Sequence, residues 1–197
     1  MSFYIEAGAN DGISQSNTRD LEAAGWTGLL IEPNIHKYRA CLSNRGSNNT
    51  VKNCALVSKD YVGDTITGSF DDTSDDSLCG QIIDDLAYCP CEEARIAGLE
   101  KIQTKTILPV PARTLQSILD EMSVTEIDFM SLDVEGYEIP AMDGLDFDKN
   151  PPKVIRIETT TLENVRTGID SYLTGKGYIL SSRPSENDAL YTLVQHD

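Results

Sequence analysis

The residues best suited to chemistry lie near the start of the chain. An apolar run at 3–7 leads into the turn Gly8–Gly12, with the sequence Gly-Ala-Asn-Asp-Gly, and a second apolar run at 28–31 ends at Glu32. Glycine lets the backbone approach a ligand closely, and a carboxylate about 24 residues later can accept both hydroxyls of a ribose. This spacing predicts one half of a nucleoside-binding site.

Four carboxylates come at the ends of predicted strands. Glu6 and Glu32 close the two strands of the nucleoside half, and Asp133 and Glu158 each follow a further apolar run. Because the carboxyl ends of parallel strands meet at one edge of a sheet, we expect the four side chains to gather there. Each of them alone is also compatible with a helix cap, since carboxylates are favoured near helix N-termini. Their coincidence favours a ligand site.

The glycine turn also indicates the class of nucleoside ligand. A dinucleotide site usually carries G-x-G-x-x-G, because the second glycine must make room for the pyrophosphate. That glycine is absent here, and the carboxylates of Glu6 and Asp11 would face the phosphates. A ribose-containing ligand with cationic groups fits better, and S-adenosylmethionine has both a sulfonium and an ammonium group. A nicotinamide-dependent oxidoreductase is therefore disfavoured.

The pattern of apolar residues predicts an α/β fold. Alternating strands and helices indicate a doubly wound, mostly parallel seven-stranded sheet with an antiparallel C-terminal strand. A further apolar run at 107–112 contains two prolines, which restricts it to an edge or loop position. The seven strands are expected at 2–7, 27–32, 51–57, 127–132, 154–157, 177–181 and 189–194, and the helices at 16–25, 34–42, 114–121 and 162–174.

One long segment interrupts this alternation. Residues 60–105 carry scattered glycines and an acidic run, so we interpret them as a variable insertion beside the site, within a single domain over 1–197. Parts of it, 81–87 and 92–101, are compatible with helices. Three of the five cysteines cluster there, but a structural zinc site wants four ligands with at least one C-x-x-C pair. Ordinary thiols at Cys79, Cys89 and Cys91 are expected, with a metal site as the alternative.

Composition and charge restrict the partners. The chain has 197 residues, 40% of them hydrophobic, with no apolar run near 18 residues and no secretory signal, so a cytoplasmic protein is expected. Its formal charge is −16, and such a surface repels phosphate backbones and anionic lipid headgroups. We therefore expect neither a nucleic acid nor a membrane as partner. The oligomeric state stays open.

Four short blocks follow one another at 5–12, 31–34, 110–115 and 127–136. They read I-E-A-G-A-N-D-G, I-E-P-N, V-P-A-R-T-L and I-D-F-M-S-L-D-V-E-G. In this order they resemble the V-D-V-G-A-N-x-G, F-E-P-N, V-P-V-R-T-L-D-S-L and D-V-E-G motifs of the FkbM-type family of S-adenosylmethionine-dependent methyltransferases. The resemblance covers most of the chain and is more specific than the glycine turn alone. It implies a Rossmann-like methyltransferase fold.

The resemblance also implies roles for single residues. The amino acid part of S-adenosylmethionine would lie near the glycine turn, the ribose on Glu32 and the adenine near the end of the third strand. Asp133 would lie beside the methionine part or the reacting methyl group, and Glu135 near the acceptor hydroxyls. The implied cofactor-binding residues are Glu6, Gly8, Ala9, Asn10, Asp11, Glu32, Pro33, Cys54, Ala55 and Asp133.

Two departures from the family pattern affect this expectation. Glu6 stands where the family usually has the shorter Asp, and the first strand begins almost at Met1, whereas the family commonly has chain upstream of it. We expect the cofactor to bind nonetheless, in a site that is open or completed by the insertion.

Methyl transfer is an in-line displacement at a carbon that the sulfonium already activates, so positioning and exclusion of water supply much of the rate. A base is needed mainly when the acceptor is a hydroxyl. Asp133 and Glu135 are the predicted catalytic residues, and His36 is a further candidate base. From the family we expect O-methylation of a glycan or another small polar metabolite. The alternative is a non-catalytic binding or interaction module on the same fold.

Overall fold

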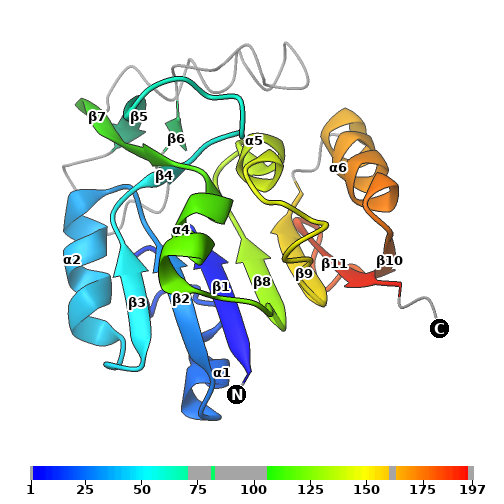
Figure 1. Cartoon of the computed structure of the whole chain (residues 1–197), viewed down its shortest axis with the longest axis horizontal. Helices are drawn as coiled ribbons and strands as arrows, with labels where there is room; N and C mark the ends of the chain where they lie inside the picture. The colour runs from blue at the N-terminus through cyan, green and yellow to red at the C-terminus, as the bar shows by residue number, and fades with distance from the viewer. Residues whose placement is uncertain (1, 71–80, 83–105, 160–162, 195–197) are drawn as a thin grey trace.

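A seven-stranded sheet carries the fold (Figure 1). Its strands are β1 (Phe3–Ala7), β2 (Thr27–Ile31), β3 (Asn49–Lys52), β8 (Phe129–Leu132), β9 (Val154–Glu158), β10 (Tyr178–Ser182) and β11 (Asp188–Leu193). In the computed structural model, which describes residues 2–70, 81–82, 106–159 and 163–194, their order is β10-β11-β9-β8-β1-β2-β3. From β3 to β9 the neighbours are parallel, whereas β11 is antiparallel to both β9 and β10. The predicted α/β fold with a mostly parallel seven-stranded sheet is confirmed.

The order of the strands reverses at β1. From β1 the chain moves outwards through β2 to β3, and it later returns to the other side of β1 to add β8 and β9. At such a reversal the connections after the two adjacent strands leave the sheet on opposite faces, which opens a crevice at their carboxyl ends. A ligand site is therefore expected where β1 and β8 end.

Alternate residues of β1 face two apolar layers. The described helices are α1 (Arg19–Ala23), α2 (Ile35–Asn44), α4 (Leu115–Met122), α5 (Glu138–Asp143) and α6 (Glu163–Gly175). Ile5 and Ala7 belong to the larger core, which includes residues of α4, α5 and α6. Tyr4 points to the opposite face, where it packs with Cys41 of α2. Since side chains alternate along a strand, helices cover both faces of β1.

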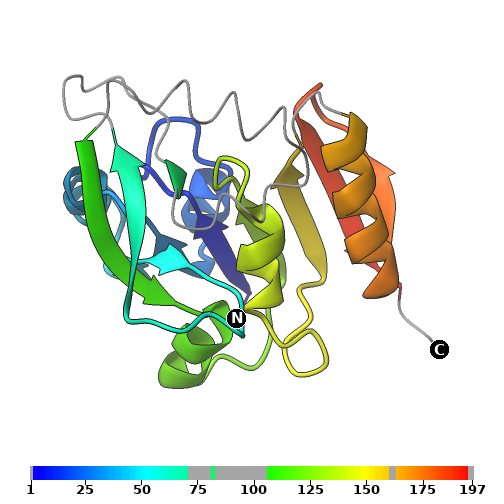
Figure 2. The same ribbon diagram turned by 90° about the horizontal axis from the view of Figure 1, so that it is seen from above.

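A second, smaller sheet lies beside the first, and the sequence does not predict it. Its strands are β4 (Ala55–Leu56), β7 (Thr106–Arg113), β5 (Thr65–Phe70) and β6 (Gln81–Ile82), in that order. Figures 1 and 2 show it at the end of the molecule away from β10 and β11. It has its own apolar cluster, which includes Ile66, Phe70, Val110 and Tyr137. Tyr137 joins this cluster to the turn after β8.

Two predictions for this region are wrong. The single strand expected at 51–57 divides, because β3 pairs in the large sheet and β4 in the small one. The helix expected at 81–87 does not begin where predicted, since residues 81–82 pair with β5 as strand β6. The rest of that segment, the predicted helix at 92–101 and the three clustered cysteines lie outside the described residues.

β7 lies inside the second sheet, but at the prolines 109 and 111 only one side of the strand is paired, as the expected edge position requires. β7 pairs with β5 along its length and with β4 at Ala112 and Arg113. The amide of Ala112 donates to the carbonyl of Asp64 (2.9 Å), so the alternate positions 109 and 111 direct their nitrogens away from β5. Because β4 pairs with β7 only beyond the prolines, the missing N–H groups interrupt neither ladder.

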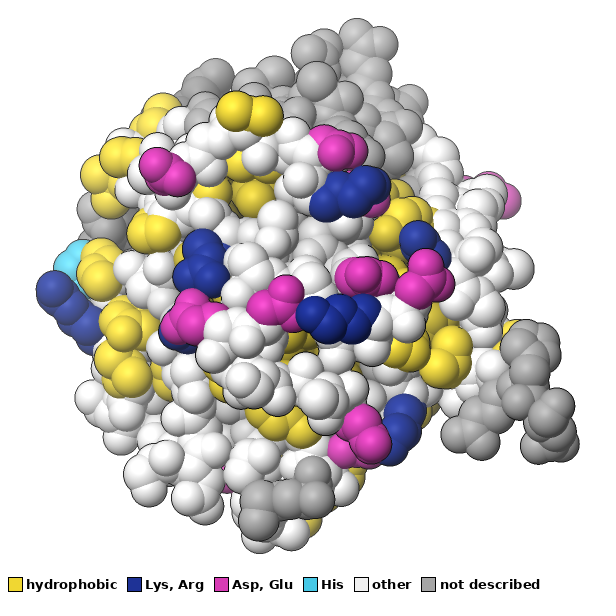
Figure 3. Space-filling view, viewed as in Figure 1, with side chains coloured by type: hydrophobic (Ala, Val, Ile, Leu, Met, Phe, Trp, Pro, Cys, Tyr) yellow, Lys and Arg dark blue, Asp and Glu magenta, His cyan; other side chains and the backbone are white. Residues whose placement is uncertain are grey.

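Several charged side chains on the face shown in Figure 3 lie beside partners of opposite sign. Ion pairs of the described residues include Lys52–Glu121, Lys59–Asp143, Lys149–Asp120 and Lys153–Asp128. The excess of acidic residues is therefore not expressed as a uniformly negative surface on this face. None of the described helices is long and apolar enough to cross a membrane.

The turn after β1 touches the end of β8. Gly8 has a φ of 83°, a region that favours glycine, and a β-carbon added there would lie 1.8 Å from the carbonyl oxygen of Asp133. The amide of Asp133 in turn donates to the carbonyl of Ala7 (3.1 Å). The contact between these two backbones therefore requires glycine at position 8, before any ligand is considered.

Replacing Gly8 by alanine should lower the free energy of unfolding by about 2–5 kcal/mol, because the new methyl group would push β1 and β8 apart at an unfavourable φ. Gly175→Ala is the matched control, since nothing lies within 4 Å of its added β-carbon. Denaturant unfolding of both variants measures the difference. Wild-type stability of Gly8→Ala would contradict the close contact.

Candidate functional site

An open cleft of about 1060 Å³ lies at the carboxyl ends of β1, β2 and β8. The turns after these strands form much of its wall, and the second sheet adds Phe70 and Ile82. Asp11 and His36, which the structure also describes, lie beside the cleft rather than in its lining. The predicted site residues in the lining are Glu6, Gly8, Ala9, Asn10, Glu32, Pro33, Cys54, Ala55, Asp133 and Glu135.

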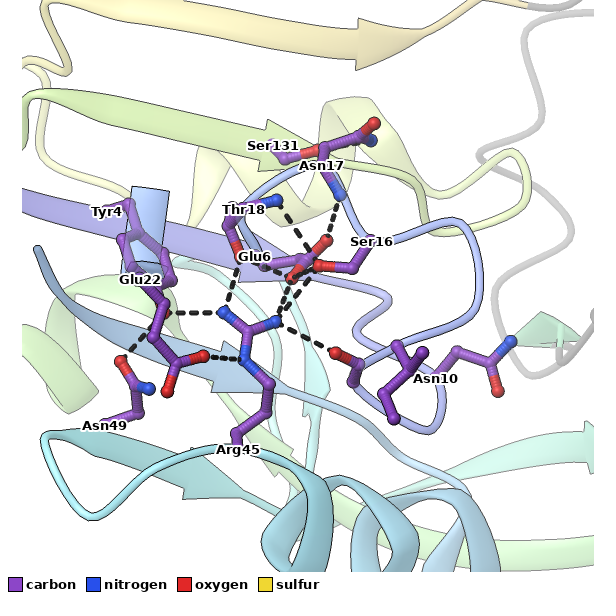
Figure 4. Close-up of polar contacts among 12 residues, drawn as sticks. Tyr4, Glu6, Asn10, Ser16, Asn17, Thr18, Glu22, Arg45, Asn49 and Ser131 are labelled. Atoms are coloured by element: carbon purple, nitrogen blue, oxygen red, sulfur yellow. Dashed lines mark hydrogen bonds and ion pairs between the residues drawn. The ribbon is translucent and has the colours of Figure 1, made fainter. Parts of the chain in front are cut away.

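Arg45, directly after α2, lies beneath the first turn with 1% of its side chain exposed (Figure 4). Its guanidinium forms ion pairs with Glu6 (Nη1 to Oε2, 3.2 Å) and with Glu22. It also donates to the hydroxyl of Tyr4 (2.6 Å) and to the carbonyl of Gly12 (3.1 Å). A buried charge is tolerated when its donors are satisfied, so this network determines where the turn lies.

Glu6 connects that charge to the next loop. Its Oε1 accepts the amide of Asn17 (2.7 Å), and its Oε2 accepts the hydroxyls of Ser16 (2.9 Å) and Thr18 (2.6 Å). Residues 14–17 of this loop line the cleft together with Glu6. The carboxylate predicted to face the cofactor is therefore turned towards protein partners, through which it shapes the wall of the cleft.

Glu32 is buried at the end of β2 and holds two turns. Its Oε2 accepts the amide of Asn10 and its Oε1 the amide of Asn34, both at 2.8 Å. Burial raises the pKa of Glu32 to about 7, although both hydrogen bonds act in the opposite direction. Each carboxylate oxygen has two acceptor positions, so one on each oxygen remains for a pair of neighbouring hydroxyls.

Asn10 leaves a polar atom for a ligand. It adopts a positive φ of 50°, and its Oδ1 is buried without a hydrogen-bond partner among the described residues. Buried polar atoms are normally satisfied, and Asn10 lines the cleft beside Glu32. An acceptor in this position suits a hydroxyl or ammonium group. Gly8, Asn10 and Glu32 are therefore compatible with a ligand that carries a ribose and a positive charge.

The carboxylate of Asp11 stabilises the turn in which it lies. Its carboxylate accepts the amides of Ile13 (2.8 Å) and Ser14 (2.7 Å). Partial burial would raise the pKa of Asp11, but the hydrogen bonds from Ser14 and Ile13 outweigh it and hold the pKa below its usual value. His36 is exposed in the first turn of α2, where its backbone amide donates to the side chain of the N-cap residue Asn34.

The end of the cleft near the second sheet is apolar. Cys54 and Ala55 line it with Leu56, Phe70 and Ile82. Burial raises the pKa of Cys54 to about 11, so its thiol stays protonated at neutral pH. An apolar wall of this kind suits the flat face of a nucleobase.

Asp133 and Glu158 lie next to each other on β8 and β9, and their carboxyl groups share a hydrogen bond. Burial raises the pKa of Asp133, and burial together with the charge of Asp133 raises that of Glu158. Asp133 lines the cleft. The structure therefore brings two of the four strand-end carboxylates into direct contact.

Glu138, which sequence reasoning missed, holds the turn after β8. Its Oε1 accepts the amides of Gly136 (3.0 Å) and Val134 (3.3 Å). Glu135 within this turn has a φ of 56°, which is strained for a residue other than glycine. Burial raises the pKa of Glu138 to about 7. A signal existed, because a glutamate at the start of a helix commonly accepts backbone amides.

Other residues of the lining also escaped sequence analysis. Phe70 and Ile82 come from the second sheet, for which no local pattern exists. The position of Lys37 could have been predicted, because Asn34 is a typical N-cap residue and places the first turn of α2 directly after β2. The lining residues that were not predicted as site residues are Ala7, Ser14, Gln15, Ser16, Asn17, Ile31, Asn34, Lys37, Leu56, Phe70, Ile82, Ser131, Val134 and Tyr137.

Arg45→Met should lower the free energy of unfolding by about 3–5 kcal/mol, because it leaves Glu6 buried without its counter-charge. Lys149→Met removes an exposed ion pair and should have a much smaller effect. Denaturant unfolding measures both. If the two substitutions cost the same, the buried network does not determine the stability of the turn.

The comparisons with known proteins agree with this geometry. The model of the methyltransferase FkbM domain matches residues 6–180, which includes the whole of the cleft described above. No curated protein and no solved structure shows a significant match to the chain. Because the family model covers most of the sequence, the chain belongs to the FkbM methyltransferase family.

Proposed function

We propose that the protein transfers a methyl group from S-adenosylmethionine to a hydroxyl of a carbohydrate or another small polar metabolite. Membership of the family supports methyl transfer. The proposal of an adenosyl donor rests on the grouping of Gly8, Asn10 and Glu32 in one cleft. In this cleft Glu32 and Asn10 both have hydrogen-bond acceptor positions that no described protein donor fills. Dinucleotides fit less well, since the turn lacks the second glycine that makes room for a pyrophosphate.

The proposed pose follows the chemistry of the lining. The ribose hydroxyls bind Glu32, and the adenine packs on the apolar wall with Cys54 and Phe70. Asn10 would hold the ammonium group, and Asp133, which lines the same cleft, would then lie on the side of the sulfonium. When bound, S-adenosylmethionine supplies a methyl carbon that its sulfonium activates.

Asp133 is the proposed base. The acceptor oxygen forms a bond to the methyl carbon as the carbon–sulfur bond breaks, the electron pair stays on sulfur, and Asp133 takes the hydroxyl proton. Burial raises the pKa of Asp133, which makes its carboxylate a better base near neutral pH. Glu135, on the strained turn beside it, is proposed to hold the acceptor hydroxyls.

Calorimetry with S-adenosylmethionine, S-adenosylhomocysteine and NAD tests the donor. We expect both adenosyl ligands to bind and NAD not to bind, because the turn lacks the glycine that would make room for a pyrophosphate. Binding of NAD alone would replace the proposal by an oxidoreductase. Binding of none of the three would leave a non-catalytic interaction module, and methyl transfer to a panel of sugars and hydroxylated metabolites tests turnover.

Glu32→Ala should weaken binding of S-adenosylhomocysteine about tenfold or more, because two hydrogen bonds to a charged group are lost. Since burial raises the pKa of Glu32 to about 7, wild-type affinity should also fall from about pH 8 to about pH 6 as the carboxylate gains a proton. Glu32→Gln should lose that pH dependence. Glu163→Gln, on the exposed start of α6, is the control. Unchanged affinity in Glu32→Ala would remove Glu32 from the ribose site.

A further inference from the structure

Three carboxylates lie in a row across the end of the large sheet. In β8 and β9 Leu132 pairs with Ile157, so Asp133 and Glu158 are the next neighbours, and Asp188 of β11 pairs with Glu158 on its other side. Leu132 and Ile157 both face the core of α4, α5 and α6. Because side chains alternate, Asp133 and Glu158 project together from the opposite face.

One of the three carboxylates has its own counter-charge. Arg156 lies two residues before Glu158, on the same face of β9, and its guanidinium binds Asp188 at 3.1 and 3.3 Å. This pairing holds the pKa of Asp188 below its usual value, against the effect of its partial burial. Asp188 is therefore ionised, and it is the carboxylate that Arg156 contacts directly.

Among the described residues neither Asp133 nor Glu158 forms an ion pair, although the charge of Arg156 lowers the pKa of Asp133 and that of Asp188 raises it. Two adjacent carboxylates in a partly buried place do not both ionise readily, and here one carboxyl donates a hydrogen bond to the other. Burial first, then the charges of Asp133, Glu135 and Glu138, raise the pKa of Glu158 to about 9. The proton therefore resides on Glu158 at neutral pH, and Asp133 accepts the hydrogen bond.

The two carboxyls differ in what they face. Among the described residues, Asp133 belongs to the lining of the cleft and Glu158 does not. The protonated member thus lies away from the substrate, and the ionised member faces it. A hydrogen bond from Glu158 favours the charged form of Asp133 and opposes part of the effect of burial, which still raises the pKa of Asp133.

We propose that Glu158 is a positioning residue for methyl transfer: its carboxyl donates a hydrogen bond to Asp133 and so keeps Asp133 ionised towards the cleft, ready to take the proton of the acceptor. This inference rests on the proposed function only for its last step. Glu158 itself does not touch the substrate, and its proton stays on it throughout the transfer.

A titration of the unliganded protein with carbon-13-labelled carboxyl groups tests the pair by NMR. Wild type should show one carboxyl that titrates at about pH 9, and Glu158→Gln should lack it. Asp133→Asn should lower the titration midpoint of Glu158 by about one pH unit or more, because the neighbouring charge is lost. Both substitutions preserve side-chain size, and Glu163→Gln should leave the titration unchanged.

Turnover separates a positioning role from a structural one. Glu158→Gln still donates a hydrogen bond and should keep kcat within about threefold, whereas Glu158→Ala should move the acidic limb of the pH–rate profile to higher pH with an unchanged KM for the donor. An unaltered profile in Glu158→Ala would overturn the proposal.

The two hypotheses fail in different experiments. If Glu158 has the same titration midpoint in wild type and in Asp133→Asn, the proposed hydrogen bond between the two carboxyls is wrong, even if the protein is an active methyltransferase. If no adenosyl ligand binds, the proposed function is wrong, but the titration of Asp133 and Glu158 still tests their hydrogen bond.

Discussion

Arg45 lies buried under the first turn of the site, and the position of that turn depends on its charge. The guanidinium meets Glu6 from β1, Glu22 from α1 and the carbonyl of Gly12, so one side chain ties together a strand, a helix and a loop. Taking a charge out of water is costly unless every donor is paired. The loop is therefore kept in the one conformation that satisfies Arg45, and its outer surface forms a wall of the cleft.

Buried glutamates fix the remaining turns in the same way. Glu32 accepts amides from Asn10 and Asn34, and Glu138 accepts amides from Val134 and Gly136. In both cases burial raises the pKa of the carboxyl to about 7, so the groups that shape the cleft also titrate near neutral pH. The acidity of the strand ends therefore has a structural role besides any role in binding.

The second sheet explains why the cleft has one polar and one apolar end. Its strands β5 and β6 add Phe70 and Ile82, which cluster with Ala55, while the turn after β1 supplies polar residues of the lining. β7 has partners on both sides only at Ala112 and Arg113, and its prolines lie in the stretch that is paired with β5 alone.

Much of the fold and of the lining was accessible from the sequence, because the signals are local. Strand-to-turn patterns place Gly8, Glu32 and Asp133 at the ends of strands, and parallel pairing then brings those ends together. Other features depend on contacts between distant residues, and no local pattern encodes them. Arg45 and Glu6 are 39 positions apart, and the contact of Asp133 with Glu158 requires the register of β8 and β9. The tertiary structure alone decides which carboxylate is paired, which keeps a proton and which faces the cleft, because burial and neighbouring charges set those states.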